Sequence, residues 1–291
     1  MASASLMMRE GCKESDTKRD MGLTTPEDIL RFDNISYGTD AMQVLDVYRP
    51  KGKEGKLPVI VSVHGGGWVY GDKDVYQYYC MNLAQRGFAV VNFTYRLSPE
   101  YKFPCHLEDT VNVFIWVLKN AETYGFDMNR CFAVGDSAGG NILALFCVLC
   151  TNPKFAENFD FKAPKDFVPK AIALNCGVYD MELAIKGESN TSELIGDIFQ
   201  NGGTAEELEL ASPLYYINEK FPPCFIMTSN EDFLKDQPEP LMEKLDKLGV
   251  SYKYQFYGTE ENVLYHVFHL DIRTEEAIVC NDEECAYFQN F

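Results

Sequence analysis

Basic residues are scarce in this chain. Lysine and arginine number 26 against 44 aspartates and glutamates, which gives a formal net charge of -18 at pH 7. An excess of negative charge repels phosphates, so it opposes binding to nucleic acid and to anionic membrane surfaces. We therefore expect neither nucleic acid nor a membrane among the partners of this protein.

Long hydrophobic runs are also absent, and no stretch approaches the roughly 18 consecutive apolar residues of a membrane span. The N-terminal residues MASASLMMREGCKESDTKRD have no long apolar core and soon become charged, unlike a signal peptide. The ten cysteines are scattered, and several lie in apolar runs, which favours buried reduced thiols and a cytoplasmic location. Cys147 and Cys150 form a C-x-x-C pair, but no histidine is near, so packing in a helix is favoured over zinc or redox chemistry.

What the chain does contain is typical of a globular protein. Its 291 residues are 46% hydrophobic and 24% charged. This length is sufficient for one large α/β domain with a sizeable core. We expect residues 1–291 to form a single domain.

Short apolar runs alternate with amphipathic segments along most of the chain. This alternation predicts an α/β fold in which a mostly parallel sheet carries helices on both faces. The expected strands are 44–48, 57–63, 88–93, 131–134, 171–175, 224–228 and 252–257. The expected helices are 75–86, 106–124, 138–150, 237–248 and 273–288.

Two segments fall outside the alternation. Residues 1–25 are polar and are expected to form a loose arm, and Thr25-Pro26-Glu27-Asp28 resembles the start of a helix. Residues 181–215 combine helical pieces with an acidic composition. We expect this second segment to be an insertion that lies over the sheet.

The chain is organised around Gly135-Asp136-Ser137-Ala138-Gly139, which joins an apolar run to a helix-like segment. A serine between two glycines at this spacing matches the nucleophile elbow, a sharp turn from strand to helix. The turn strains the serine backbone, and side chains at the flanking positions would clash. The alternative is a glycine-rich helix N-terminus that packs closely on a sheet.

A catalytic serine needs a base, and the base needs an acid that orients it. In the α/β-hydrolase arrangement the acid and then the histidine follow the serine, each after a late strand. Only His266 and His269 follow Ser137, and position alone leaves both open as the base. The acid candidates after strand 224–228 are Glu231, Asp232 and Asp236, some of which must simply be solvated.

Besides a base and an acid, a catalytic serine needs a site that stabilises the oxyanion, the carbonyl oxygen that becomes negative during the reaction. His64-Gly-Gly-Gly-Trp68 directly follows strand 57–63, and its glycines allow backbone N–H groups to point into a cavity. A phosphate-binding loop is the alternative, but no Lys-Ser or Lys-Thr follows the glycines. Elbow and glycine triplet together favour acyl-transfer chemistry without a metal or cofactor.

These motifs resemble the hormone-sensitive-lipase-like esterases of the α/β-hydrolase superfamily, over about residues 44–270. The matching residues are His64-Gly-Gly-Gly-Trp68, Tyr95-Arg-Leu-Ser-Pro-Glu100 with Phe103-Pro104, Gly135-Asp-Ser-Ala-Gly-Gly-Asn141, Asp232-Phe-Leu-Lys-Asp236 and His266-Val-Phe268. The resemblance implies Ser137 as nucleophile, Asp232 as acid and His266 as base. It also implies an oxyanion hole formed by the amides of Gly66, Gly67 and Ala138, and cap elements from about residues 1–33 and 181–215.

Three features depart from the family pattern. Val267 stands where glycine usually follows the histidine, residues 258–262 form a polar insert, and the N-terminal segment has no recognisable match.

Aromatic residues are expected to line a compact substrate pocket: Trp68, Tyr70, Tyr179, Tyr215 and Tyr216.

The function expected from these features is hydrolysis of small carboxylic esters with short acyl groups, acetyl to butanoyl. Formamidases or amidases, and esterases of acetylated or feruloylated sugars, are alternatives that use the same triad. A non-catalytic small-molecule receptor on the same scaffold is a remote alternative.

Overall fold

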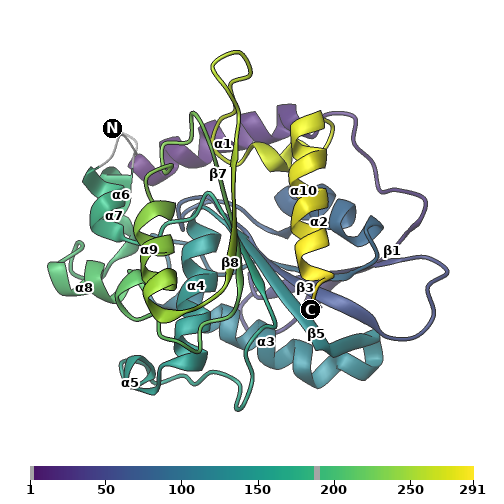
Figure 1. The fold of residues 1–291 in the computed structure, drawn as a ribbon, viewed down its shortest axis with the longest axis horizontal. Coiled ribbons are helices and arrows are strands. Elements are labelled where there is room, and N and C mark those ends of the chain that lie inside the picture. Colours follow the sequence, from purple (N-terminus) through teal and green to yellow (C-terminus); the bar gives the residue numbers. More distant parts are fainter. Residues whose placement is uncertain (1–2, 187–190) are drawn as a thin grey trace.

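A computed structural model describes residues 3–186 and 191–291 (Figure 1). Its centre is an eight-stranded sheet with the strand order β1-β2-β4-β3-β5-β6-β7-β8. The strands are β1 (Ile29–Ser36), β2 (Val44–Pro50), β3 (Leu57–Val63), β4 (Ala89–Phe93), β5 (Phe126–Asp136), β6 (Ile172–Asn175), β7 (Cys224–Ser229) and β8 (Tyr252–Tyr257). The pairs β1–β2 and β2–β4 are antiparallel, and all the other neighbours are parallel. The predicted mostly parallel sheet is confirmed.

Helices pack on both faces of this sheet. The α-helices are α1 (Ala4–Arg19), α2 (Lys73–Gln85), α3 (Cys105–Tyr124), α4 (Ala138–Thr151), α5 (Pro153–Ala156), α6 (Met181–Lys186), α7 (Thr191–Ile198), α8 (Ala205–Leu210), α9 (Pro238–Leu248) and α10 (Glu275–Phe288). Two short 3₁₀ helices are η1 (Pro213–Tyr215) and η2 (Phe268–Leu270). All seven predicted strands and all five predicted helices are confirmed, although β5 begins at Phe126 rather than at residue 131.

The sheet separates two hydrophobic cores. Along β3, Val59, Val61 and Val63 belong to the core beneath α3, α4 and α9. The alternate residue Ile60 belongs to the core beneath α2 and α10, on the opposite side of the sheet (Figure 1). A continuous β-branched run therefore forms this strand because both of its faces are buried.

The expectation of a loose arm at residues 1–25 is wrong. Residues Ala4–Arg19 form α1, which lies across one end of the sheet beside α7 (Figure 1). The Arg9 guanidinium donates hydrogen bonds to the carbonyls of Val69 and Ser98 and pairs with Glu100 at 2.6 Å. The helix is therefore held by contacts with distant parts of the chain, which its polar sequence does not reveal.

The helix expected to start at Thr25 is also absent, because this segment leads into strand β1. The Thr25 hydroxyl accepts a hydrogen bond from Arg31 at 2.8 Å instead of capping a helix. Ile29 begins β1, which pairs with β2 at the edge of the sheet. Residues 29–33 of the expected N-terminal cap element therefore lie in β1.

The insertion at residues 181–215 contains α6, α7, α8 and η1. Residues 187–190 of this segment lie outside the described residues.

All ten cysteines are free thiols, as predicted. Among the residues that the structure describes, no helix combines the length and the apolar character needed to cross a membrane.

Candidate active site

Ser137 occupies the turn between β5 and α4 with φ 52° and ψ -121°, a strained conformation for a residue with a side chain. The flanking glycines are required by close backbone contacts. A Cβ atom at position 135 would lie 2.5 Å from the Gly139 carbonyl oxygen, and one at position 139 would lie 2.1 Å from the Val63 carbonyl oxygen. The predicted steric basis of the elbow is confirmed.

Asp232 and His266 form a hydrogen-bonded pair at the carboxyl ends of the late strands. Asp232 follows β7, His266 follows β8, and Asp232 Oδ1 lies 2.7 Å from His266 Nδ1. The Thr228 hydroxyl donates to Asp232 Oδ2 at 2.7 Å, and the Leu234 amide donates to Oδ1 at 2.9 Å. Burial opposes ionisation of Asp232, but the hydrogen bond and charge of His266 and these two donors hold the pKa of the carboxyl below its ordinary value.

The other two acid candidates do not contact a histidine in this way. Glu231 and Asp236 have exposed side chains. The backbone of Glu231 has a different part in the site, because its N–H donates to the Leu264 carbonyl at 3.0 Å. This bond holds the loop of the acid against the loop of the histidine.

His269, the other candidate base, is fully buried. Its ring lies edge-on to Tyr79 at 5.2 Å, and within the described residues neither ring nitrogen has a hydrogen-bond partner. Burial lowers the pKa of His269 to about 3, so its imidazole is neutral. The geometry therefore favours His266 over His269 as the base. Position in the sequence alone had left both open.

The glycine triplet forms part of the wall of the cavity that also contains Ser137. Gly66 and Gly67 have φ values of 110° and 61°, and a Cβ at position 66 would lie 2.2 Å from the Tyr70 carbonyl oxygen. Ala138 is the first residue of α4, where backbone N–H groups have no intrahelical acceptor. The three amides proposed for the oxyanion hole thus come from the loop after β3 and from the first turn of α4.

Tyr76 links the oxyanion loop to the nucleophile elbow, a connection that sequence analysis missed. Its hydroxyl accepts from the Gly65 amide at 2.9 Å and donates to Asp136 Oδ2 at 2.7 Å. Burial raises the pKa of Asp136 to about 6, against the opposing effect of this Tyr76 hydrogen bond. Tyr76 is on the helix that follows the loop, but the sequence gives no local signal that its hydroxyl points back to Gly65.

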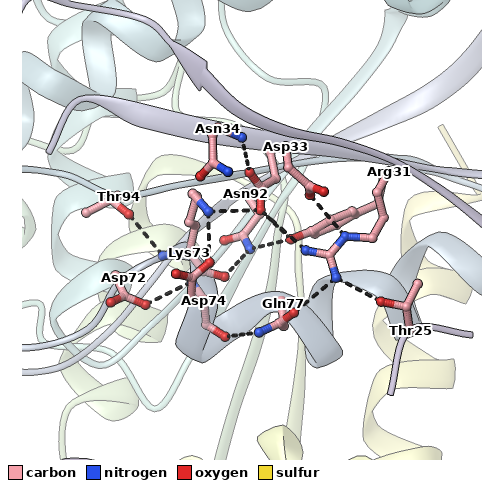
Figure 2. A network of polar contacts seen from close by, with 12 residues as sticks. Thr25, Arg31, Asp33, Asn34, Asp72, Lys73, Asp74, Gln77, Asn92 and Thr94 are labelled. Carbon is pink, nitrogen blue, oxygen red and sulfur yellow. Dashed lines mark hydrogen bonds and ion pairs between the residues drawn. The ribbon is translucent and has the colours of Figure 1, made fainter. Parts of the chain in front are cut away.

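A buried ion pair anchors the other end of the oxyanion loop. Lys73 Nζ lies 3.2 Å from Asp46 Oδ2, and their side chains are 6% and 0% exposed. Figure 2 shows Lys73 within a polar network that joins α2 to β1, β2 and β4. Asn92 contributes by donating to the Lys73 carbonyl at 2.7 Å, so the start of α2 is fixed to the sheet.

Ser137 and His266 line one cavity of about 570 Å³. Trp68 and Tyr70 line it as expected, together with Met7 and Met8 of α1, which the loose-arm interpretation had missed. Tyr179, Tyr215 and Tyr216 are not among the described lining residues, so the expectation for these three is wrong. Tyr179 is instead a core residue, Tyr215 donates to Asp180, and Tyr216 packs on Phe155.

One group of side chains has the composition of a metal site. Ligand atoms of Cys176, Asp232 and His266 all lie within 4.8 Å of one another. A metal-binding thiol must lose its proton, but burial and then the nearby Asp232 charge raise the pKa of Cys176 well above its ordinary value. The donor set therefore suits a hydrogen-bonded acid and histidine better than a metal ion.

The mostly parallel sheet, the strained elbow after β5 and the acid–histidine pair after β7 and β8 define an α/β-hydrolase. The BD-FAE family model matches residues 45–245. The chain belongs to this family, and thereby to the hormone-sensitive-lipase-like esterases of the α/β-hydrolase superfamily.

Curated relatives agree with this assignment. Carboxylesterase NlhH of Mycobacterium tuberculosis is 30% identical over 259 residues, which cover 79% of this chain and 75% of NlhH. Esterase LipC of the same organism is 33% identical over 150 residues, 51% of this chain, and the match spans only 37% of LipC's length.

Solved structures share the fold. The crystal structure of esterase B from Lactobacillus rhamnosis has a TM-score of 0.89 at 24% sequence identity. The match covers 98% of this chain and 93% of the esterase B chain.

Proposed function

We propose that this protein is a serine carboxylic-ester hydrolase that acts through an acyl-enzyme. The observation that carries the proposal is the 2.7 Å contact between Asp232 and His266 at the cavity that contains Ser137. Membership of an esterase family supports the same activity.

In the proposed mechanism His266 takes the proton of the Ser137 hydroxyl, which attacks the ester carbonyl. The amides of Gly66, Gly67 and Ala138 donate hydrogen bonds to the oxyanion of the tetrahedral intermediate. His266 then protonates the leaving alcohol, and water releases the acid from Ser137 with the same roles reversed. Asp232 holds the imidazole in one orientation and stabilises its cationic form.

Short acyl groups, acetyl to butanoyl, are the proposed substrates. Met8 and Leu194 support a small acyl group beside the oxyanion loop, because they line the cavity there and their side chains lie within 3.1 Å of a Cβ built at Gly67. We also propose a cytoplasmic location and small-molecule substrates rather than nucleic acid or membranes, which the ten free thiols and the net charge of -18 support.

A series of p-nitrophenyl esters tests this function. We expect kcat/KM to peak between acetyl and butanoyl, and Ser137→Ala to abolish hydrolysis of all of them. A peak at ten carbons or more would contradict the acyl preference. Formyl amides and acetylated sugars tested in parallel distinguish an amidase or a sugar esterase, and binding without turnover would indicate a receptor.

A further inference from the structure

Phe233 lies directly on the imidazole of His266. The two ring centroids are 4.2 Å apart, with an angle of 41° between the ring planes. Phe233 is nevertheless 47% exposed, and it lines the cavity that contains Ser137. An aromatic ring beside the base therefore offers further apolar surface to whatever occupies the cavity.

Backbone contacts hold Phe233 in this position. Glu231 and Tyr265 form a parallel β-bridge, and the Glu231 N–H donates to the Leu264 carbonyl at 3.0 Å. On the other side of Phe233, the Leu234 amide donates to the Asp232 carboxylate at 2.9 Å. The bridge fastens the segment that carries Phe233 to the segment that carries His266, and the Leu234–Asp232 bond fixes the turn around Phe233.

The chemistry of the base places the leaving alcohol near this ring. The histidine that activates the serine later gives its proton to the leaving oxygen, so the leaving group must lie beside the imidazole. A side chain in contact with His266 and facing the cavity is then a neighbour of that leaving group. We propose that Phe233 is a specificity-determining residue that packs against an aromatic ring in the leaving alcohol.

The walls of the cavity also restrict the charge of the substrate. Among the described lining residues Asp16, Asp136 and Glu193 are acidic, and none is lysine or arginine. An aromatic alcohol that carries a carboxylate or phosphate would therefore meet acidic side chains and no lysine or arginine in the described lining. The favoured substrates are short-chain esters of uncharged alcohols that contain an aromatic ring.

This inference rests on the proposed ester hydrolysis, and two matched substrates test it separately. Benzyl acetate and cyclohexylmethyl acetate share the acyl group, a primary alcohol and a six-membered ring, and differ in aromaticity. Aromatic pairs add about 0.5–1.5 kcal/mol beyond area burial, equivalent to about a 2- to 10-fold preference in kcat/KM for benzyl acetate. Phe233→Leu should remove this preference, and Phe233→Tyr should retain it.

Phe256→Leu is the control, because Phe256 is a 54% exposed phenylalanine on β8 that is not among the described lining residues. It should leave the ratio of the two substrates unchanged. If Phe233→Leu lowers kcat/KM equally for both substrates, the ring only supports His266 and the inference is overturned. Ethyl acetate serves as a reference without a ring: if the wild-type protein fails to hydrolyse any of the three acetates, it is the proposed function that fails.

Discussion

The Asp232 carboxylate and the His266 imidazole lie 2.7 Å apart, although 34 residues separate them in the chain. His269, only three residues further on in η2, is buried against Tyr79. The same short stretch thus presents one histidine to a carboxylate and buries the other in the core.

Alanine substitutions should separate these two histidines. We expect His266→Ala to lower kcat by at least about 10³-fold, because the base of a catalytic triad is lost. His269→Ala should retain activity within about 10-fold and lower the free energy of unfolding by about 2 kcal/mol, because it leaves a cavity in the core. Kinetics with p-nitrophenyl acetate and urea denaturation check both. Loss of activity in His269→Ala alone would reverse the assignment.

The Tyr76 hydroxyl should support catalysis because it holds both the oxyanion loop and the nucleophile elbow. Tyr76→Phe leaves the Gly65 amide and the Asp136 carboxylate without this partner, so we expect kcat to fall about 10-fold with little change in KM.

Tyr79→Phe is the matched control for Tyr76, since its hydroxyl donates to Glu284 instead. It should lower stability by about 1 kcal/mol and leave kcat unchanged. Equal effects of the two variants on kcat would show that Tyr76 has no special part in positioning the oxyanion loop.

The Lys73–Asp46 pair should contribute strongly to stability. Lys73→Met leaves a buried carboxylate without its nearest cation, and removal of one partner from a buried pair costs about 3–5 kcal/mol.

Lys247→Met removes the exposed ion pair with Glu243, whose partners are 73% and 63% exposed, and should cost less than about 1 kcal/mol. Urea denaturation of both variants measures the difference. A loss in Lys73→Met no larger than that in Lys247→Met would contradict a structural role for the buried pair.

Glu284 should make stability depend on pH. Burial raises the pKa of Glu284 to about 7, against the hydrogen bonds from Asn175 and Tyr79. Because the folded-state pKa is the higher one, this contribution to stability is complete below about pH 4.5 and is lost as the pH rises through about 7.

Glu284→Gln should therefore gain stability relative to the wild-type protein between pH 5 and pH 8, on the order of 1–3 kcal/mol. Glu275→Gln, an exposed substitution in the same helix, is the control and should follow the wild-type curve. Thermal denaturation over this pH range measures the effect. Parallel curves for the wild-type protein and Glu284→Gln would contradict it.

Local patterns predicted the elements that lie in the centre of the fold. Strand β3 is a continuous apolar run whose burial depends only on a sheet with helices around it, so its range in the structure equals the predicted one. Helix α1 and strand β1 depend instead on distant partners: Arg9 contacts the loop after β3, and β1 pairs with β2. These contacts leave no periodic signal, which explains why both elements were missed.

The candidate site also combines residues that the sequence predicts with residues that it does not. Glycine spacing identified Ser137 and the oxyanion loop, because steric demands on the backbone act on the residue type itself. Other residues of the site act through contacts with parts of the chain that are distant in sequence: Tyr76, Asp46 and Phe233. The residue type alone does not distinguish them from other tyrosines, aspartates and phenylalanines, so the sequence does not predict their roles. The size and walls of the cavity likewise depend on where α1 packs.

The central claim is that Ser137 is the nucleophile, and covalent labelling tests it most directly. The intact mass of the protein is measured after incubation with a p-nitrophenyl alkylphosphonate, which transfers a phosphonyl group to an activated serine. We predict one adduct per chain on the peptide that contains Ser137, loss of ester hydrolysis in step with labelling, and no adduct in Ser137→Ala. An adduct on another residue, or full hydrolytic activity in Ser137→Ala, would contradict the account.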